Sequence, residues 1–182
     1  MLRTERLILR DWRDDDLDAF AAMGRDPEVM AHFPTLLARD RSDVLAARIR
    51  DGLAREGFGF WAVEVIGGDP FIGFCGLSRP AFDAHFTPCV EVGWRLARAS
   101  WGHGYATEAA RAAIAFGGDT LALPEIVAFL LPANARSARV CERIGMTRDL
   151  AGDFDHPLIP DGTISVGGIP QRRHALYRIA MG

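Results

Sequence analysis

The protein has 182 residues, 49% of them hydrophobic, and a formal net charge of −3. This length and apolar content suffice for one domain with a sizeable core. The small negative charge excludes a general positive field for nucleic acid. No apolar run approaches the roughly 20 residues that cross a bilayer. We therefore predict neither a nucleic-acid partner nor a membrane partner.

The N-terminal segment and the cysteines predict a cytoplasmic protein. The N-terminus lacks the basic end, long apolar stretch and small-residue cleavage site of a signal peptide. The cysteines are odd in number and stand in apolar surroundings, which predicts reduced, buried thiols at Cys75, Cys89 and Cys141.

The first 25 residues predict a strand and then a helix. Residues 2–9 are expected to form the first strand. Carboxylates are favourable at the positive end of a helix, and three of them stand together here: Asp14, Asp15 and Asp16. A metal cluster is the alternative for this triplet, and a solvated helix cap is the favoured interpretation. The helix is expected to bury Leu17, Phe20 and Ala21.

Residues 41–77 predict a second helix and a pair of strands. The helix is expected over 41–55, ending at Gly57 and burying Val44, Leu45, Ile49 and Leu53. Residues 58–66 and 70–77 are typical of strands, and the Gly-Gly-Asp-Pro turn between them is a hairpin signal.

The stretch over residues 88–117 predicts a strand, a glycine-rich turn and a helix. The strand covers 89–97, and Gly102 and Gly104 then flank His103. The helix has an apolar face at i, i+3, i+4, i+7 and i+8, formed by Ala106, Ala109, Ala110, Ala113 and Ile114. A turn of this kind presents unpaired amides at the positive end of a helix, which favours a phosphate-bearing ligand. The alternative is that the glycines only allow close packing.

Two nucleotide-binding motifs are incomplete at this turn. The third glycine of a dinucleotide fingerprint is missing, since Tyr105, Ala106 and Thr107 follow Gly104. The sequence has no Gly-Lys-Ser/Thr either. A nucleotide-dependent oxidoreductase is therefore the weakest of the function classes considered.

The last third predicts two further strands around a helix. Residues 125–131 are typical of a buried strand, and Asn134 is a natural N-cap for a helix ending at Gly145. This helix is expected to bury Ser137, Val140, Cys141 and Ile144. A strand starts over 146–150, residues 152–172 predict a long functional loop, and 174–179 closes the sheet. The pattern predicts an α/β fold with a mixed sheet.

Several segments together resemble one family. W-G-H-G-Y-A-T-E-A resembles the acetyl-CoA pyrophosphate loop of the GCN5-related N-acetyltransferases (GNAT), particularly the ribosomal-protein N-terminal acetyltransferase (RimJ/RimL-type) branch. The other similar segments are TERLILRDWRDDDLDAF, NARSARVCERIGM, DFDHP and HALYRIA. The resemblance implies a single N-acetyltransferase domain over residues 1–182. Its fold would be that of the acyl-CoA N-acyltransferases, with a mixed central sheet, splayed central strands and flanking helices.

The resemblance also implies acetyl-CoA as co-substrate, with no metal. The pantetheine arm would enter the splay and pair with backbone of Trp94 and Leu96. The pyrophosphate would lie over the amides of Gly102, His103, Gly104, Tyr105, Ala106 and Thr107. Asn134 and Ser137 carry over as cofactor-side residues, with helix capping and packing as the alternatives. A role in binding CoA phosphates and a solvated face are both open for Arg136, Arg139 and Arg143.

Catalytic residues are harder to assign. Glu91 is the candidate general base, and the alternative is an outward polar residue on an alternating strand. Many family members have a tyrosine proton donor where this chain has Cys141, so the donor is unassigned and Ser137 is the candidate. Cys141 itself is expected to be a packing residue. His156 is expected to order its loop, because no second histidine or cysteine stands at ligand spacing.

The implied reaction is acetyl transfer from acetyl-CoA to a primary amine, by direct attack in a ternary complex. The acceptor would be a protein N-terminal α-amine or a small-molecule amine, entering between residues 25–40 and 152–172. The alternative function is a non-catalytic acyl-CoA-binding sensor or partner protein, to which the missing tyrosine points. An edge strand or an exposed apolar helix is the candidate surface for a homodimer.

Overall fold

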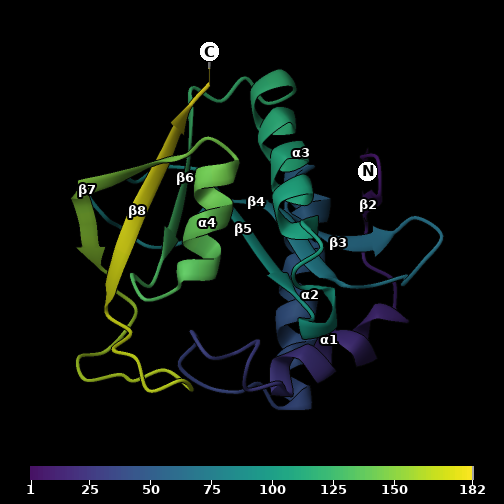
Figure 1. Ribbon diagram of the computed structural model, residues 1–182, viewed down its shortest axis with the longest axis horizontal. Helices are drawn as coiled ribbons and strands as arrows, with labels where there is room; N and C mark the ends of the chain where they lie inside the picture. The colour runs from purple at the N-terminus through teal and green to yellow at the C-terminus, as the bar shows by residue number, and fades with distance from the viewer. Residues whose placement is uncertain (182) are drawn as a thin grey trace.

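The computed structural model describes residues 1–181 and contains one eight-stranded sheet (Figure 1). Its strand order is β1-β2-β3-β4-β5-β6-β8-β7, and every neighbouring pair is antiparallel except β5 and β6. The strands are β1 (Leu2–Arg3), β2 (Leu7–Arg10), β3 (Phe60–Val65), β4 (Gly73–Ser78), β5 (Glu91–Leu96), β6 (Glu125–Leu130), β7 (Thr147–Asp155) and β8 (Arg173–Ala180). The helices are α1 (Asp16–Arg25), α2 (Arg39–Glu56), α3 (Tyr105–Asp119) and α4 (Ala135–Arg143).

The helices cover both faces of this sheet, and each face has its own apolar cluster. The larger cluster lies between the strands and α3 with α4, and includes Ala109, Ala113 and Cys141. The smaller cluster lies under α1 and α2 and includes Phe20, Ala46 and Phe74. Alternate residues of a strand point to opposite faces, so each central strand contributes to both clusters.

The central strands separate, as the resemblance implied. β5 and β6 are paired only at Glu91 and Val127, where the Val127 N–H donates to the Val90 carbonyl at 2.9 Å. β5 keeps its full pairing with β4, from Ser78 opposite Glu91 to Gly73 opposite Leu96. The splay therefore opens beside the second half of β5. The α/β fold expected from the sequence is confirmed.

The start of the chain differs from the prediction of one strand over 2–9. The Thr4 hydroxyl accepts a hydrogen bond from the Leu7 N–H at 2.9 Å, and the Thr4 N–H donates to the Leu7 carbonyl at 2.9 Å. The resulting tight turn folds the segment into β1 and β2, with Leu2 opposite Leu9.

The predicted solvated cap is wrong for Asp16. Asp14 and Asp15 are exposed, whereas the Asp16 side chain is buried and accepts two hydrogen bonds from Arg10 at 2.8 Å. Asp15 occupies the N-cap position without a side-chain cap bond. An arginine on the neighbouring strand therefore determines the environment of Asp16.

Three smaller expectations also change. Val44 is exposed because α2 packs through Ser42, Ala46 and Leu53 instead. Cys89 is half-buried, while Cys75 and Cys141 are buried, and all three are free thiols. β7 runs on to Asp155, into the predicted loop, because a bulge after Asp149 lets Phe154 pair again with His174. Among residues 1–181, no helix has the length and apolarity to cross a bilayer.

Candidate active site

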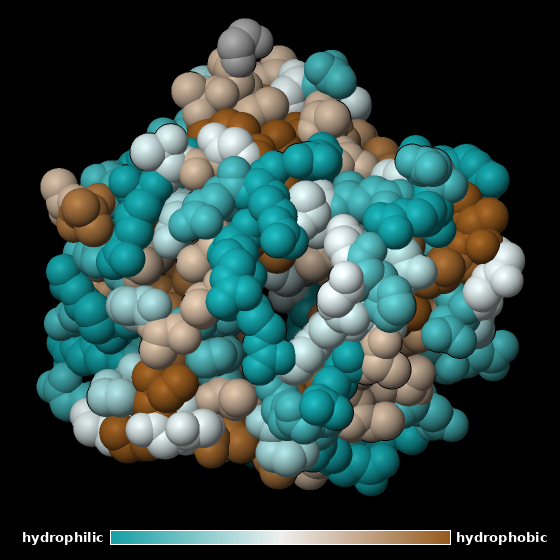
Figure 2. Space-filling view, in the orientation of Figure 1, coloured by the Kyte–Doolittle hydropathy of each residue, from teal (hydrophilic) through white to brown (hydrophobic). Residues whose placement is uncertain are grey.

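A cleft of about 790 Å³ occupies the splay between β5 and β6. Its walls come from the start of α3, from α4, and from two segments far apart in sequence, residues 28–34 and 156–174. In the space-filling view, hydrophilic residues cover α4 beside a hollow in the surface (Figure 2). The sequence-predicted cofactor residues line this cleft, except for His103.

The turn before α3 presents a row of free backbone donors. Gly102 and Gly104 both have φ of 81°, a left-handed conformation that favours glycine, and Gly104 is the N-cap of α3. No hydrogen bond within the described chain uses the amides of residues 102–107, and the first helical bond is donated by Glu108 to the Gly104 carbonyl at 3.1 Å. These six N–H groups sit at the positive end of a 15-residue helix. The arrangement suits a phosphate or diphosphate.

The β1–β2 turn holds this loop in place. The Thr4 hydroxyl donates to Glu108 at 2.6 Å, and Arg6 pairs with the same carboxylate at 2.6 Å. Arg6 also donates to the His103 carbonyl at 3.0 Å. Burial alone would raise the pKa of Glu108, but the hydrogen bonds from Thr4 and Arg6 lower it. The Glu108 carboxylate is thereby held against the β1–β2 turn, and the residues of the amide row other than His103 line the cleft.

The exposed edge of β5 lies beside this loop. The Val90 carbonyl points toward β6. Backbone groups alternate in direction along a strand, so the N–H and carbonyl groups of Val92, Trp94 and Leu96 also point toward β6 and into the splay. The Leu96 carbonyl is already engaged, since it accepts a hydrogen bond from the Trp101 indole at 2.9 Å. Trp94 therefore offers both backbone groups to a ligand in the splay, and Leu96 offers its N–H.

Asn134 and Ser137 begin α4 on the other side of the cleft. The Asn134 side-chain oxygen accepts a hydrogen bond from the Ser137 N–H at 3.2 Å, so the predicted N-cap is present. Both residues line the cleft. The Ser137 hydroxyl makes no hydrogen bond to any residue in the described part of the chain.

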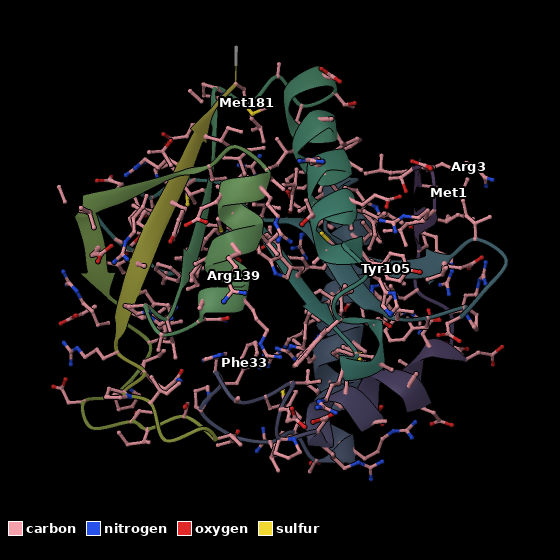
Figure 3. The ribbon with its side chains drawn as sticks, in the orientation of Figure 1. Met1, Arg3, Phe33, Tyr105, Arg139 and Met181 are labelled. Carbon is pink, nitrogen blue, oxygen red and sulfur yellow. The ribbon has the colours of Figure 1, made fainter. Side chains whose placement is uncertain are left out.

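The three arginines of α4 also line the cleft. Arg136 lies over the Trp101 ring, with its guanidinium carbon 4.1 Å from the ring centroid. Arg139 and Arg143 form no ion pair with residues 1–181. Figure 3 shows Arg139 on α4 and Tyr105 at the start of α3 on opposite sides of the opening.

Glu91 lies at the inner end of the splay. Its carboxylate accepts a hydrogen bond from the Ser78 hydroxyl at 2.8 Å, across the β4–β5 pair. Burial raises the pKa of Glu91 to about 7, although the Ser78 hydrogen bond lowers it. Glu91 lines the cleft, so this carboxyl titrates near neutral pH where a ligand reaches it.

No tyrosine occupies the position of the family's usual proton donor. Cys141 at that position is fully buried in the larger cluster, and burial raises the pKa of its thiol to about 12. The expectation that Cys141 is a packing residue is confirmed. Of the two tyrosines, Tyr177 is buried in the same cluster and Tyr105 starts α3.

The two segments expected to flank the acceptor entrance are joined to each other. Val166 donates to the Phe33 carbonyl at 2.9 Å, and Gly167 donates to the Ala31 carbonyl at 2.9 Å. The Gln171 side chain donates to the His32 carbonyl at 3.2 Å. In Figure 1 these loops lie side by side below the sheet. They form one wall of the cleft, so the expected opening between them is bridged.

His156 lies in a cluster of aromatic rings that the sequence did not predict. Its ring centroid is 4.5 Å from that of Phe82 and 5.2 Å from that of His174. A second histidine is thus near in space although distant in sequence, and burial lowers the pKa of both imidazoles. Phe86, Phe129 and Phe154 complete the cluster. Within residues 1–181, no three His, Cys, Asp or Glu side chains lie together as a metal site.

Sequence reasoning also missed Arg95 and His32, which line the cleft. Alternation along β5 places Glu91, Gly93 and Arg95 on one face, so this pattern could have drawn attention to Arg95. His32 carried no local signal, because its segment is irregular and is positioned by the distant residues 166–171.

The fold and the cleft define an α/β protein with a splayed sheet and an amide-lined phosphate site. A family model described as an acetyltransferase (GNAT) domain matches residues 6–147. The chain therefore belongs to the GNAT family of N-acetyltransferases.

Individual proteins are similar over most of their length. The Bacillus subtilis (strain 168) protein YkkB is 31% identical over 146 residues, which cover 80% of this chain and 84% of YkkB. A GNAT-family acetyltransferase structure from Bacillus anthracis has a TM-score of 0.78 at 26% identity, covering 99% of this chain and 98% of the other. Spermidine N-acetyltransferase from Vibrio cholerae, solved with CoA and spermine, shares the fold with a TM-score of 0.72 at 15% identity, covering 98% and 97% of the two chains.

Proposed function

We propose that this protein binds acetyl-CoA in the splay and transfers the acetyl group to a primary amine by direct attack in a ternary complex. The observation that carries the proposal is the row of six unused amides at residues 102–107, beside an open strand edge. The proposal treats residues 1–182 as a single N-acetyltransferase domain acting in the cytoplasm.

Backbone groups would provide most of the hydrogen bonds to CoA. The amides of residues 102–107 would bind the diphosphate, because no hydrogen bond within residues 1–181 uses them and they stand at the positive end of α3. The backbone of Trp94 and the N–H of Leu96 would pair with the pantetheine arm. Arg139 and Arg143 are cleft arginines without an ion pair in residues 1–181, and they suit the remaining phosphate charge.

Glu91 would remove the proton from the attacking ammonium group, directly or through one water. A lysine-like amine costs about 4–5 kcal/mol to deprotonate at pH 7, whereas an α-amine costs only about 1 kcal/mol. A carboxyl with a pKa of about 7 is suited to a general base at neutral pH. The nitrogen then forms a bond to the acetyl carbon while the carbon–sulfur bond breaks.

The leaving thiolate would take its proton from water, and a hydroxyl of the cleft would stabilise the sulfur by a hydrogen bond. Ser137 lines the cleft and its hydroxyl has no partner among the described residues, so it would donate a hydrogen bond to the sulfur. Cys141 is buried away from the cleft and would take no part. This departure from the family's tyrosine favours a second candidate function, an acyl-CoA-binding sensor that lacks turnover.

The test is binding followed by turnover. Isothermal titration should show acetyl-CoA binding, and a thiol-release assay over an amine and peptide panel should show transfer. Glu91→Gln should lower kcat by roughly 10²–10⁴-fold and leave the acetyl-CoA Kd unchanged. Glu125→Gln is the matched control, because Glu125 opens β6 as Glu91 opens β5, pairs with Arg178 and lies outside the cleft lining.

Each result has a distinct meaning. Acetyl-CoA binding without thiol release for any amine would favour the sensor. Equal turnover of the Glu91→Gln variant and the wild type would remove Glu91 from the mechanism. A protein that does not bind acetyl-CoA would contradict the whole proposal.

A further inference from the structure

Arg95 is a cleft arginine whose charge is not neutralised by the chain. It lies on β5 and lines the cleft, and its Nε and Nη1 atoms are shielded from solvent without any hydrogen-bond partner. No carboxylate within residues 1–181 forms an ion pair with it. Burial lowers the pKa of its guanidinium to about 10, so the group is still charged at neutral pH.

Other partly buried arginines of this protein behave differently. Arg10 pairs with Asp16 and Glu64, Arg148 pairs with Asp153, and Arg178 pairs with Asp149 and Glu125. Leaving a charge out of water without a partner is costly, so the exception at Arg95 needs an explanation.

Two aromatic rings hold the Arg95 side chain in place. Its guanidinium carbon lies 4.1 Å from the centroid of Phe33 and 5.4 Å from that of Phe74. Phe33 is itself fixed by the hydrogen bond from Val166 to its carbonyl, and Figure 3 shows it at the lower end of the opening. The rings orient the guanidinium but supply no anionic oxygen. The fork of N–H donors is thus preorganised and unused.

The position of Arg95 on the sheet indicates which of the two substrates, acetyl-CoA or the acceptor amine, it faces. Glu91, Gly93 and Arg95 share the sheet face under α1 and α2, whereas the amides of residues 102–107 start α3, which packs on the opposite face. His32, next to Phe33, lines the same cleft. Its Nδ1 atom is also shielded from solvent and has no hydrogen-bond partner. The other glutamate of the cleft, Glu28, is already paired with Arg98 at 2.7 Å.

We propose that Arg95 recognises an anionic oxygen group, a carboxylate or a phosphate, carried by the acceptor amine. The inference rests on the proposed acetyl transfer and specifies its substrate class. The acceptor would place its amine at Glu91 and its anionic group against Arg95, passing Gly93 and the Phe60 ring that packs beside it. Simple amines and polyamines would then be poor acceptors.

The experiment uses acceptors in matched pairs. Amino acids, dipeptides and tripeptides are each supplied as the free acid and as the C-terminal amide, and phosphoethanolamine is compared with ethanolamine. We expect the anionic member to have a kcat/KM roughly 10- to 100-fold higher in one of these series, as a charge-assisted bidentate contact provides. Comparison of the carboxylate series with the phosphate series identifies which of the two anionic groups Arg95 binds. Equal kcat/KM values within every pair would overturn the proposal.

Variants at Arg95 test whether this residue binds the anionic group of the acceptor. Arg95→Met should reduce the preference to less than about 3-fold, mainly through the acceptor KM, with the acetyl-CoA KM unchanged. Arg95→Lys should retain part of the preference, because it keeps the charge without the planar fork. Arg48→Met is the control, since Arg48 is exposed, forms no ion pair with residues 1–181 and lies outside the cleft lining. A preference that survives Arg95→Met would overturn the proposal.

Calorimetry separates this inference from the proposed function. Each anionic member of the matched pairs is titrated into the wild type and Arg95→Met, with CoA present. Weaker binding by roughly 10- to 100-fold in the variant supports the inference even if no acetyl transfer is detected. Transfer without any anionic preference would overturn the inference and leave the proposed function intact.

Discussion

Arg10 and Arg95 lie in one row across the sheet and have opposite surroundings. Arg10 on β2 is opposite Ala62, Ala62 is opposite Phe74, and Phe74 is opposite Arg95 on β5. At one end of the row, Arg10 donates to Asp16 at 2.8 Å and to Glu64 at 2.7 Å. At the other end, Arg95 meets two aromatic rings and no carboxylate of residues 1–181.

The difference separates a group that holds the fold together from one that is free for a ligand. Arg10 ties β2 to β3 and to the start of α1, and its donors are satisfied by the protein itself. Several unused polar groups instead line the cleft: the amides of Gly102 and residues 104–107, the Ser137 hydroxyl, and nitrogens of Arg95 and His32. Removing a satisfied group should therefore lower stability, and removing an unused one should lower binding or turnover.

The largest expected effect is on Arg10. Arg10→Met would leave the Asp16 carboxylate buried without its partner and should lower the free energy of unfolding by about 3–5 kcal/mol. Arg95→Met removes a charge without breaking an ion pair, so the expected change is less than about 1 kcal/mol. Urea unfolding of both variants measures the contrast. Equal losses would mean that Arg95 is structural.

Ser78 provides the next effect, on the pH dependence of turnover. Its hydrogen bond lowers the pKa of Glu91, so Ser78→Ala should raise that pKa above its value of about 7, by about one to two units for a charge-assisted bond. A general base acts when deprotonated, so the rising limb of kcat/KM should move to higher pH by the same amount. A pH profile measures the shift, and Ser78→Thr, which keeps a hydroxyl, is the control. An unmoved limb would show that Glu91 is not the titrating base.

Gly104 should show a smaller effect, on the amide site. With φ at 81°, Gly104→Ala forces a side chain into the left-handed region, at a cost of about 1–2 kcal/mol in stability. If the loop relaxes, the amides move from their positions at the start of α3 and acetyl-CoA binding weakens by roughly 10-fold. Gly52→Ala in α2 is the matched control, because it has open space around it and should stabilise by about 0.5–1 kcal/mol. Unfolding and titration calorimetry report the two quantities.

Local signals explain how much of the site could be predicted. The amide row depends on two glycines followed by a helix, and the cap at Asn134 depends on one residue and its own helix, so both follow from short stretches of sequence. The free guanidinium of Arg95 depends on residues from β4 and from the irregular segment that holds Phe33. No short stretch contains that information.

The same reasoning explains the errors in the fold. Asp16 had the local signature of a solvated cap, and only pairing with Arg10 on another element buries it. Residues 152–155 had the composition of a loop, yet they return to β8 after a bulge that the Asp149 side chain stabilises by accepting from the Gly152 N–H. Alternation and helical periodicity predicted where the regular elements lie, and contacts between distant elements set the exceptions.

The smallest expected effect is at Asn134, which belongs both to the groups that stabilise the fold and to the groups that line the cleft. It is a satisfied cap, because its oxygen accepts from the Ser137 N–H, and it is also a cleft residue. Asn134→Ala should lower stability by about 1 kcal/mol through the lost cap. Asn134→Ser keeps a capping oxygen and should restore most of that stability.

Acetyl-CoA binding to these two Asn134 variants then distinguishes the roles, because Ser lacks the amide nitrogen that could reach the cofactor. If Asn134 only caps α4, Asn134→Ser should match the wild type in both unfolding and acetyl-CoA titration. If its amide also contacts the cofactor, Asn134→Ser should recover stability while its Kd for acetyl-CoA stays several-fold weaker, as expected for one lost hydrogen bond. We expect the second result, since the amide nitrogen of Asn134 makes no hydrogen bond to the described residues and the side chain lines the cleft.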